Sequence, residues 1–263
     1  MTQRRDRPPA RPRGRADVAS AAPVERGHGI ARVLSKLGYC SRTQGEALVR
    51  AGRVRVDGRV VHDPEHRTLA SAARIEVDGR PVAAEAPVTL MLNKPRGLVT
   101  TRDDPEGRDT IYRCLEGLGL PHVSPVGRLD KASEGLLLLT NDTVFAQRLL
   151  DPASHVPKTY HVQIDRSADE ALLAGIRAGV EDRGEPLAVR SVRVLREGER
   201  TAWLEIVLDE GRNRHIRRLL AALGTDTLRL VRVSIGALAL GDLPKGAVRP
   251  LTPDERALLE RTS

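Results

Sequence analysis

The chain has few of the residues on which disulfide-rich, zinc-binding or membrane-spanning proteins depend. Cys40 and Cys114 are its only cysteines, too few for a disulfide framework and without a zinc-ligand spacing. We therefore expect two reduced thiols and no metal. No apolar run approaches the length of a membrane span, and the first residues lack the apolar core of a secretory signal. These absences predict a cytoplasmic protein with no membrane partner.

Acidic residues are also in the minority. The 43 Lys and Arg residues against 35 Asp and Glu residues give a net charge of +8, and the pI is about 10.1. Such an excess predicts a polyanionic partner, most naturally a nucleic acid. Residues 1–28 hold seven Arg and four Pro with hardly any apolar period, which predicts a disordered basic arm. The arm either adds nonspecific phosphate contacts or is only a solvated tail.

Residues 29–87 predict a small module of two helices and short hairpins. Ser41 and Gln44 have the spacing of a capping box, and Asp57-Gly58 and Asp78-Gly79 are tight hairpin signals. Glu46 stands almost alone against the cations of the helix pair, so one face should be strongly positive, although a run of charge is usually only a solvated face. If this face binds RNA, the expected contacts are Arg32, Lys36, Ser41, Arg42, Arg50 and Arg53.

The stretch 124–142 organises the rest of the chain. Its polar loop 127–130 lies between two apolar runs, so two buried strands should lead into and out of the loop. Arg128 and Lys131 flank Asp130 and favour an ionised carboxylate, as a nucleophile or a general base requires. The residues alone leave two interpretations open: a catalytic Asp, or an Asp that only satisfies a turn.

Three further segments carry basic residues in suggestive positions. The turn 93–97, Asn-Lys-Pro-Arg-Gly, follows a strand and is suited to a phosphate. Tyr160 lies on a predicted strand with alternating faces and offers a flat surface for stacking a base in a chain with 2% aromatic residues, although an isolated Tyr is normally a core residue. The segment 210–220 predicts a helix with an apolar stripe. Its arginines are expected to stay free for RNA or a carboxylate: Arg212, Arg214, Arg217 and Arg218.

The chain carries a stretch that strongly resembles the signature of RNA pseudouridine synthases: Gly127-Arg128-Leu129-Asp130 followed by Ser133-Glu-Gly-Leu-Leu-Leu-Leu-Thr-Asn-Asp142. The segment 41–58 resembles an S4 RNA-binding domain, which binds structured RNA by shape and phosphate contact. The combination is similar to the ribosomal pseudouridine synthases that carry an S4 domain ahead of the catalytic domain.

This resemblance implies a role for individual residues. Asp130 falls on the family's nucleophile, Tyr160 on the residue that packs against the target base, and Arg217 on the basic partner of the nucleophile. These three are the predicted catalytic residues. The residues expected to bind the substrate are Arg128, Lys158, Arg212, Arg214, Ile216 and Leu230.

We therefore predict an α+β chain with three parts. A disordered arm over residues 1–28 precedes an S4 RNA-binding domain over 29–87 and a catalytic domain over 88–263, built on a mainly antiparallel mixed sheet flanked by helices. The implied function is the isomerisation of specific uridines in ribosomal RNA, in large-subunit more than in small-subunit RNA, by a monomer that needs no cofactor. The expected partner is ribosomal RNA or a ribosome-assembly intermediate.

Two other classes of function remain as alternatives. The chain could be a noncatalytic S4-type RNA-binding or ribosome-assembly factor, which an assay for turnover would separate from an enzyme. It could also be a hydrolase that uses Asp130 and Glu134 as paired carboxylates. Such a pair needs a raised pKa on its acid, and the basic neighbours oppose this.

Overall fold

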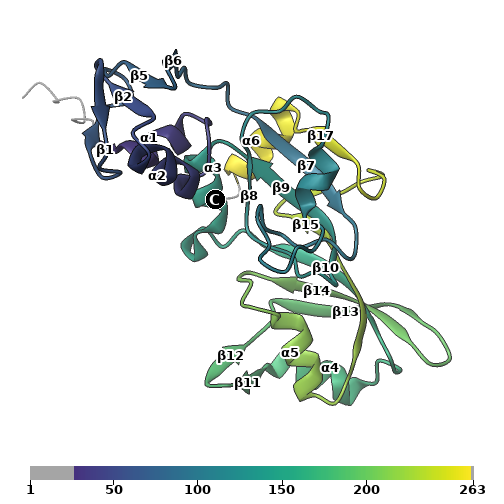
Figure 1. Cartoon of the computed structure of the whole chain (residues 1–263). Helices are drawn as coiled ribbons and strands as arrows, with labels where there is room; N and C mark the ends of the chain where they lie inside the picture. The colour runs from purple at the N-terminus through teal and green to yellow at the C-terminus, as the bar shows by residue number, and fades with distance from the viewer. Residues whose placement is uncertain (1–26, 262–263) are drawn as a thin grey trace, which may run out of the picture.

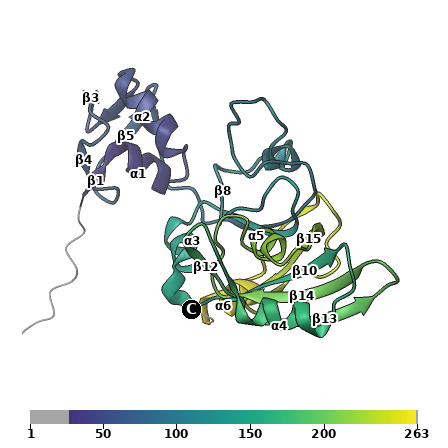
Figure 2. The same cartoon turned by 90° about the horizontal axis from the view of Figure 1, so that it is seen from below.

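The computed structural model of the chain describes residues 27–261, so nearly all of the predicted basic arm lies outside the described residues. The described part forms a small N-terminal lobe and a larger lobe, joined by a single segment of extended chain (Figures 1 and 2). No helix within residues 27–261 combines the length and the apolar character that crossing a membrane requires.

The N-terminal lobe packs two short helices against small sheets. The side-chain hydroxyl of Ser41 accepts from the backbone N–H of Gln44, and the Gln44 side chain accepts in return, so the predicted capping box is confirmed. Asp57 and Asp78 adopt left-handed φ values of 49° and 52° ahead of their glycines, which confirms both hairpin turns. The elements are β1 (His28–Gly29), α1 (Ile30–Lys36), α2 (Arg42–Arg50), β2 (Val54–Val56), β3 (Arg59–Val61), β4 (Arg67–Thr68), β5 (Ile75–Val77) and β6 (Arg80–Pro81).

The larger lobe is built on one sheet with the strand order β13-β14-β10-β15-β9-β7-β17. Its neighbouring strands are antiparallel except β15 and β9, which confirms the prediction of a mainly antiparallel mixed sheet in an α+β chain. The strands are β7 (Thr89–Lys94), β8 (Ser124–Pro125), β9 (Glu134–Thr140), β10 (Lys158–Ile164), β11 (Val180–Asp182), β12 (Glu185–Leu187), β13 (Ser191–Glu197), β14 (Ala202–Leu208), β15 (Thr227–Ile235), β16 (Leu238–Ala239) and β17 (Val248–Pro250). The helices are η1 (Ile111–Leu115), α3 (Thr143–Leu150), η2 (Pro152–Ser154), α4 (Glu170–Ala178), α5 (His215–Ala222) and α6 (Pro253–Arg261).

Helices cover the sheet unevenly, and the strand sequences follow this coverage. Leu137 and Leu139 of β9 face the core shared with α4 and α5, whereas Leu136 and Leu138 face the core shared with α3 and α6. Burial on both faces explains the unbroken apolar run of β9. Strand β10 alternates buried and half-buried residues from Tyr160 onward, because one of its faces is partly open to solvent.

Gly135 sets the junction between β9 and β15. The two strands pair only at Glu134 with Val231 and at Gly135 with Arg232, and Gly135 has φ +101°. A Cβ atom on Gly135 would lie 2.2 Å from the carbonyl oxygen of Arg232. Only glycine allows this approach of the two backbones, so the strand that leads out of the 127–133 loop is held directly against the strand that carries Arg232.

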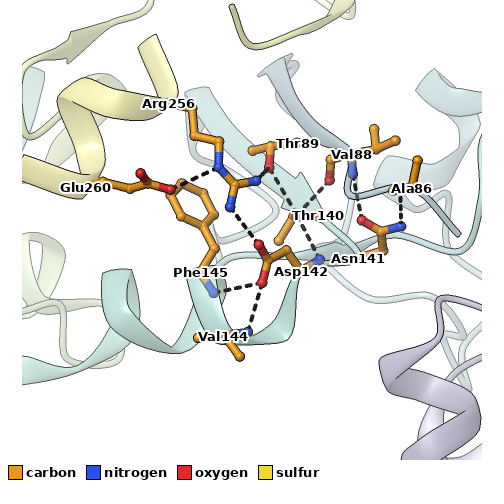
Figure 3. Close-up of polar contacts among 10 residues, drawn as sticks. All are labelled: Ala86, Val88, Thr89, Thr140, Asn141, Asp142, Val144, Phe145, Arg256 and Glu260. Atoms are coloured by element: carbon orange, nitrogen blue, oxygen red, sulfur yellow. Dashed lines mark hydrogen bonds and ion pairs between the residues drawn. The ribbon is translucent and has the colours of Figure 1, made fainter. Parts of the chain in front are cut away.

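The end of the signature stretch ties several elements together (Figure 3). Asp142 caps α3 by accepting from the backbone N–H groups of Val144 and Phe145, and its second oxygen lies 2.6 Å from the guanidinium of Arg256 in α6. Arg256 also stacks over the ring of Phe145 at 4.5 Å. Asn141 holds the segment between the lobes through hydrogen bonds with the backbone of Ala86 and Val88. Residues 141 and 142 are therefore architectural.

Candidate active site

A cavity of about 420 Å³ lies where the loop 127–133, the sheet strands β10, β14 and β15, and the start of α5 meet. Helix α5 contacts β15, the strand that pairs with β10 (Figure 2). The cavity brings together every residue that the sequence analysis assigned to catalysis or substrate binding, although these residues come from four separate segments of the chain. They are Arg128, Asp130, Lys158, Tyr160, Arg212, Arg214, Ile216, Arg217 and Leu230.

Asp130 stands out among the carboxylates that line the cavity. Asp209 pairs with Arg190 at 3.1 Å, and Glu210 pairs with Arg212 at 2.9 Å. Within the described residues, Asp130 has no cation within 4.0 Å of its carboxylate and no side-chain hydrogen bond. This carboxylate is therefore available to a molecule in the cavity.

The backbone from Asp130 to Ser133 is held by a buried lysine. Lys94 is 0% exposed, and its ammonium donates to the carbonyl oxygens of Pro95 at 3.0 Å, Asp130 at 3.2 Å and Ser133 at 2.9 Å. Burial lowers the pKa of Lys94 to about 8, against the opposing effect of Asp130. The turn 93–97 was expected to suit a phosphate, and for Lys94 this is wrong because its three donors are used inside the protein.

Arg217 reaches the same loop from α5. Its guanidinium donates to the carbonyl oxygens of Ala132 and Thr227, each at 3.2 Å, and its Nε is buried without a partner. No ion pair within 4.0 Å joins Arg217 to Asp130, so the direct pairing expected from the sequence is not made in this structure. Burial lowers the pKa of Arg217, Arg214 lowers it further, and Asp130 opposes them, so the two charges interact through space.

The floor and one wall of the cavity carry apolar side chains, and the buried Arg232 also lies on the floor. Tyr160 is 8% exposed, and its strand is paired on both sides, with Ile206 of β14 and Arg232 of β15 opposite it. Ile216 and Leu230 are buried beside it. A planar ring entering the cavity would therefore meet one aromatic surface and aliphatic contacts.

The rim of the cavity is basic. Arg128 and Arg214 are exposed, and Arg212 is half-buried. Arg214 has a left-handed φ of 50° just before α5, a conformation that is uncommon for arginine and that recurs at functional sites. Burial lowers the pKa of Lys158, and the nearby Arg232 lowers it further.

Two residues at the start of α5 are held inside the protein and do not face the cavity rim as free cations. Arg218 was expected to be free for RNA, but it pairs with Asp182 and with Glu185, which fastens α5 to the hairpin β11–β12. His215, the first residue of α5, is 3% exposed, and burial lowers its pKa. Neither residue is therefore available as a cationic contact.

Glu134 does not fit the paired-carboxylate alternative. Its side chain is 3% exposed and accepts from Arg229 at 2.8 and 3.0 Å, while Lys245 lies at 2.6 Å. The hydrogen bonds from Arg229 hold the pKa of Glu134 at about 2, with Lys245 adding to the effect and burial opposing it. A carboxyl group in this state has no proton to give near neutral pH, so it cannot serve as the acid of a hydrolase.

The helix pair of the N-terminal lobe is less one-sided than its sequence suggested. Arg42 lies 3.4 Å from Glu46 and 3.1 Å from Glu65, and Arg53 lies 2.5 Å from Asp78. Arg50 also contacts Glu46, and the Lys36 ammonium is 2.7 Å from a ring nitrogen of His28. Arg32 is exposed on α1, and the Ser41 hydroxyl is used by the helix cap. Glu46 is therefore not nearly alone in opposing these cations.

Sequence reasoning missed Lys94 and Arg232 as components of the site. Arg232 lines the cavity two residues after Leu230, so the period of two along a strand would have placed both side chains on one face. The turn 93–97 drew attention to Lys94 as a phosphate contact but gave no signal of its role in the site, because the carbonyl oxygens of Asp130 and Ser133 that it binds belong to a loop more than thirty residues later. Among residues 27–261, no group of three or more His, Cys, Asp or Glu side chains is arranged to hold a metal ion.

Comparisons with known proteins agree with this arrangement. Residues 29–71 match the model of the S4 domain, and residues 88–222 match the model of the RNA pseudouridylate synthase family. An uncharacterised RNA pseudouridine synthase of Mycobacterium tuberculosis is 41% identical over 233 residues, which cover 88% of this chain and 92% of the relative. One from Rickettsia prowazekii is 36% identical over 217 residues, 82% of this chain and 91% of the relative.

A solved structure leads to the same family. The crystal structure of a pseudouridylate synthase is 28% identical, with a TM-score of 0.61, and the match covers 88% of this chain and 99% of that chain. An S4 module followed by this catalytic fold defines an enzyme that modifies RNA. The chain belongs to the RNA pseudouridine synthase family, whose reaction is the isomerisation of uridine in RNA.

Proposed function

We propose that this chain isomerises a specific uridine of ribosomal RNA, in the large subunit, with Asp130 as the nucleophile. One observation carries the proposal: Asp130 is the lining carboxylate that has no ion-pair partner within the described residues. It faces a cavity with an aromatic floor and a basic rim, which suits a nucleobase attached to a phosphate backbone.

The reaction begins with the target uridine outside the RNA stack, because a stacked base leaves no room for a side chain at its glycosidic bond. Flipping costs on the order of a few kcal/mol, which phosphate contacts of the S4 lobe and of the cavity rim offset. Tyr160 packs against the uracil, while Ile216 and Leu230 close the pocket around it. Asp130 then attacks the nucleotide, and Arg217 keeps the loop after Asp130 in place through Ala132.

The overall change needs no external group and no redox partner. The uracil leaves the ribose through nitrogen and rejoins it through carbon, so substrate and product have the same mass. The proposed form of the enzyme is a cytoplasmic monomer that acts on ribosomal RNA or on an assembly intermediate. The net charge of +8 and the S4 lobe support this class of partner, and the S4-bearing architecture with the 212–218 arginine run supports the large subunit.

Release of tritium from uracil labelled at carbon 5 tests the reaction, because that carbon exchanges its hydrogen for the ribose. The wild-type chain should release tritium from large-subunit RNA, or from particles that contain it, without added metal or cofactor. Chemical mapping of pseudouridines in ribosomal RNA from cells with and without the gene then identifies the position. A noncatalytic RNA-binding factor would release no tritium from any of these substrates.

A further inference from the structure

Arg232 is a buried arginine on the floor of the cavity. It lies on β15, is 5% exposed, and is directly opposite Tyr160 in the neighbouring strand. Its Nε donates to the carbonyl oxygen of Leu136 at 2.7 Å, and its buried Nη2 has no hydrogen-bond partner. In the part of the chain that the structure describes, no carboxylate lies within 4.0 Å of this guanidinium.

Lys158 is a second cation on the same face of the sheet. It lies two residues before Tyr160 on β10 and also lines the cavity. Its ammonium has only a long contact of 3.5 Å with the carbonyl oxygen of Asp209. Two cations thus neighbour Tyr160, one opposite it on β15 and one two residues before it on β10, and neither has a carboxylate within 4.0 Å among residues 27–261.

A buried cation without a counter-ion is costly, because the loss of its hydration is not offset by a partner. Such an arrangement is retained where a ligand supplies the missing negative charge. Phosphates of the RNA backbone can already bind the exposed arginines of the rim, Arg128 and Arg214. Arg232 instead lies opposite Tyr160, the aromatic residue on which the base packs. From this position its side chain can reach the edge of a uracil ring that lies against Tyr160.

We propose that Arg232, together with Lys158, binds a carbonyl oxygen of the target uracil and stabilises the negative charge that the ring acquires during isomerisation. This inference rests on the proposed function and adds a substrate contact to it. A guanidinium held by its Nε against Leu136 is fixed before the substrate arrives. Such preorganised donors act strongly in a site from which water is excluded.

Charge develops on the uracil whichever atom Asp130 attacks. If a carboxylate oxygen of Asp130 bonds to ribose C1′, the bond between C1′ and uracil N1 breaks, and both of its electrons stay with the uracil, which becomes an anion with charge on its oxygens. Carbon 5 then bonds to C1′ and displaces the Asp130 carboxylate, the hydrogen on carbon 5 leaves as a proton, and N1 takes up a proton. If Asp130 first adds to carbon 6, the electron pair of the C5–C6 double bond moves onto the carbonyl oxygen at carbon 4. The bond between N1 and C1′ then breaks, carbon 5 bonds to C1′, and loss of the proton from carbon 5 restores the double bond as Asp130 leaves carbon 6 and N1 is protonated. A cation at a uracil oxygen favours both routes.

Single-turnover tritium release by Arg232→Gln tests the proposal. At saturating RNA the rate should fall by about 10² to 10³-fold, the usual effect of losing one preorganised donor, while the Kd for RNA changes less than about threefold. Arg193→Gln is the matched control, because Arg193 is a sheet arginine paired with Glu205 on an exposed surface and does not line the cavity. Its rate should equal that of the wild type.

A wild-type saturating rate in Arg232→Gln would overturn the inference. If Arg232 instead bound a phosphate, its loss would weaken the binding of RNA and reduce the salt dependence of binding by about one ion, while the saturating rate would stay unchanged. If circular dichroism shows that the Gln variant is unfolded, Arg232→Lys provides the test instead. An ammonium lacks the planar arrangement of donors with which a guanidinium binds the carbonyl oxygen of Leu136 and a uracil oxygen at the same time, so we expect the saturating rate to fall by about tenfold. An unchanged saturating rate in the Lys variant refutes the proposal. A wild-type enzyme that releases no tritium would refute the proposed function itself.

Discussion

Three arginines of the S4 face differ in exposure and in pairing from three of the cations that line the cavity. The side chains of Arg42, Arg50 and Arg53 are 52–65% exposed, and each lies within 4.0 Å of a carboxylate. In the cavity, Lys158 and Arg217 are half-buried and Arg232 is buried, and within residues 27–261 none has a carboxylate at that distance.

This difference separates affinity from chemistry. An exposed ion pair contributes about 0–1 kcal/mol, so an arginine of the S4 face can exchange its carboxylate for an RNA phosphate at little cost. A buried cationic side chain cannot rotate into solvent. Its charge is screened less than a charge at the surface, so it acts more strongly on a molecule that enters the cavity. Substitutions in the cavity should therefore change the rate at saturating RNA, and substitutions on the S4 face should change the Kd.

Asp130→Asn breaks the chemistry and should give the largest effect. The amide keeps the size of the side chain but removes its negative charge, so the saturating rate of tritium release should fall by about 10⁴-fold or more. The Kd for RNA and the circular dichroism spectrum should stay close to those of the wild type. An Asn variant with full activity would refute Asp130 as the nucleophile, and one that no longer binds RNA would show that the carboxylate is structural.

Lys94→Met tests whether the loop around Asp130 must be held in place. Three carbonyl oxygens lose their shared donor, and a shift of about 1 Å in a reacting group costs roughly 10²-fold in rate. We expect that loss in the saturating rate with little change in the Kd, because Lys94 is buried away from the RNA. If the lysine bound a phosphate instead, the Kd would weaken and the saturating rate would survive.

Glu134→Gln distinguishes a structural carboxylate from a catalytic one. Arg229 and Lys245 are 38% and 58% exposed and can turn to solvent, so the loss of their buried partner should lower the free energy of unfolding by about 2 kcal/mol in a urea titration. Below the unfolding transition the variant should keep substantial activity. The paired-carboxylate alternative requires it to be as inactive as Asp130→Asn.

The lowered pKa of Glu134 also predicts how the stability of the fold depends on pH. The pKa of Glu134 is lowered to about 2 in the folded chain from an ordinary value of 4.5, so the unfolded chain binds its proton first as the pH falls. The stabilisation is fully present above pH 4.5 and is lost as the pH falls towards 2. The wild type should lose more stability than Glu134→Gln over this window, and parallel curves for the two proteins would contradict the assignment.

Local signals predicted the parts of the fold that depend on neighbouring residues. The capping box at Ser41, both Asp-Gly turns and the doubly covered strand at residues 136–139 are confirmed, because each is set by residues a few positions apart. The residues of the cavity were predicted in a different way. A resemblance to a family, and not the periodicity of the sequence, identified the four segments that the fold brings together.

Errors arose where the decisive partner is distant in the chain. Arg42 meets Glu65 and Arg53 meets Asp78, 23 and 25 residues away, so a local count of charge could not show that these arginines are paired. Arg218 meets Asp182 and Glu185 across 36 and 33 residues. For each of these arginines, a β-hairpin lies between the two residues in the sequence and brings the chain back to the arginine. The pairing register of the strands then determines which carboxylate lies beside it.

The smallest expected effects concern the S4 face and test its half of the comparison directly. Arg42→Gln removes one phosphate contact, so the Kd for RNA should weaken several-fold and the slope of log K against log salt should fall in magnitude by about 0.7 to 0.9. Glu65→Gln is the matched opposite: it frees Arg42 from a carboxylate at 3.1 Å, so binding should tighten slightly at low salt. Both variants should keep the wild-type rate at saturating RNA. If Arg42→Gln instead lowered that rate with an unchanged Kd, the S4 face would take part in chemistry, and the division between exposed, paired cations and buried, unpaired cations would fail.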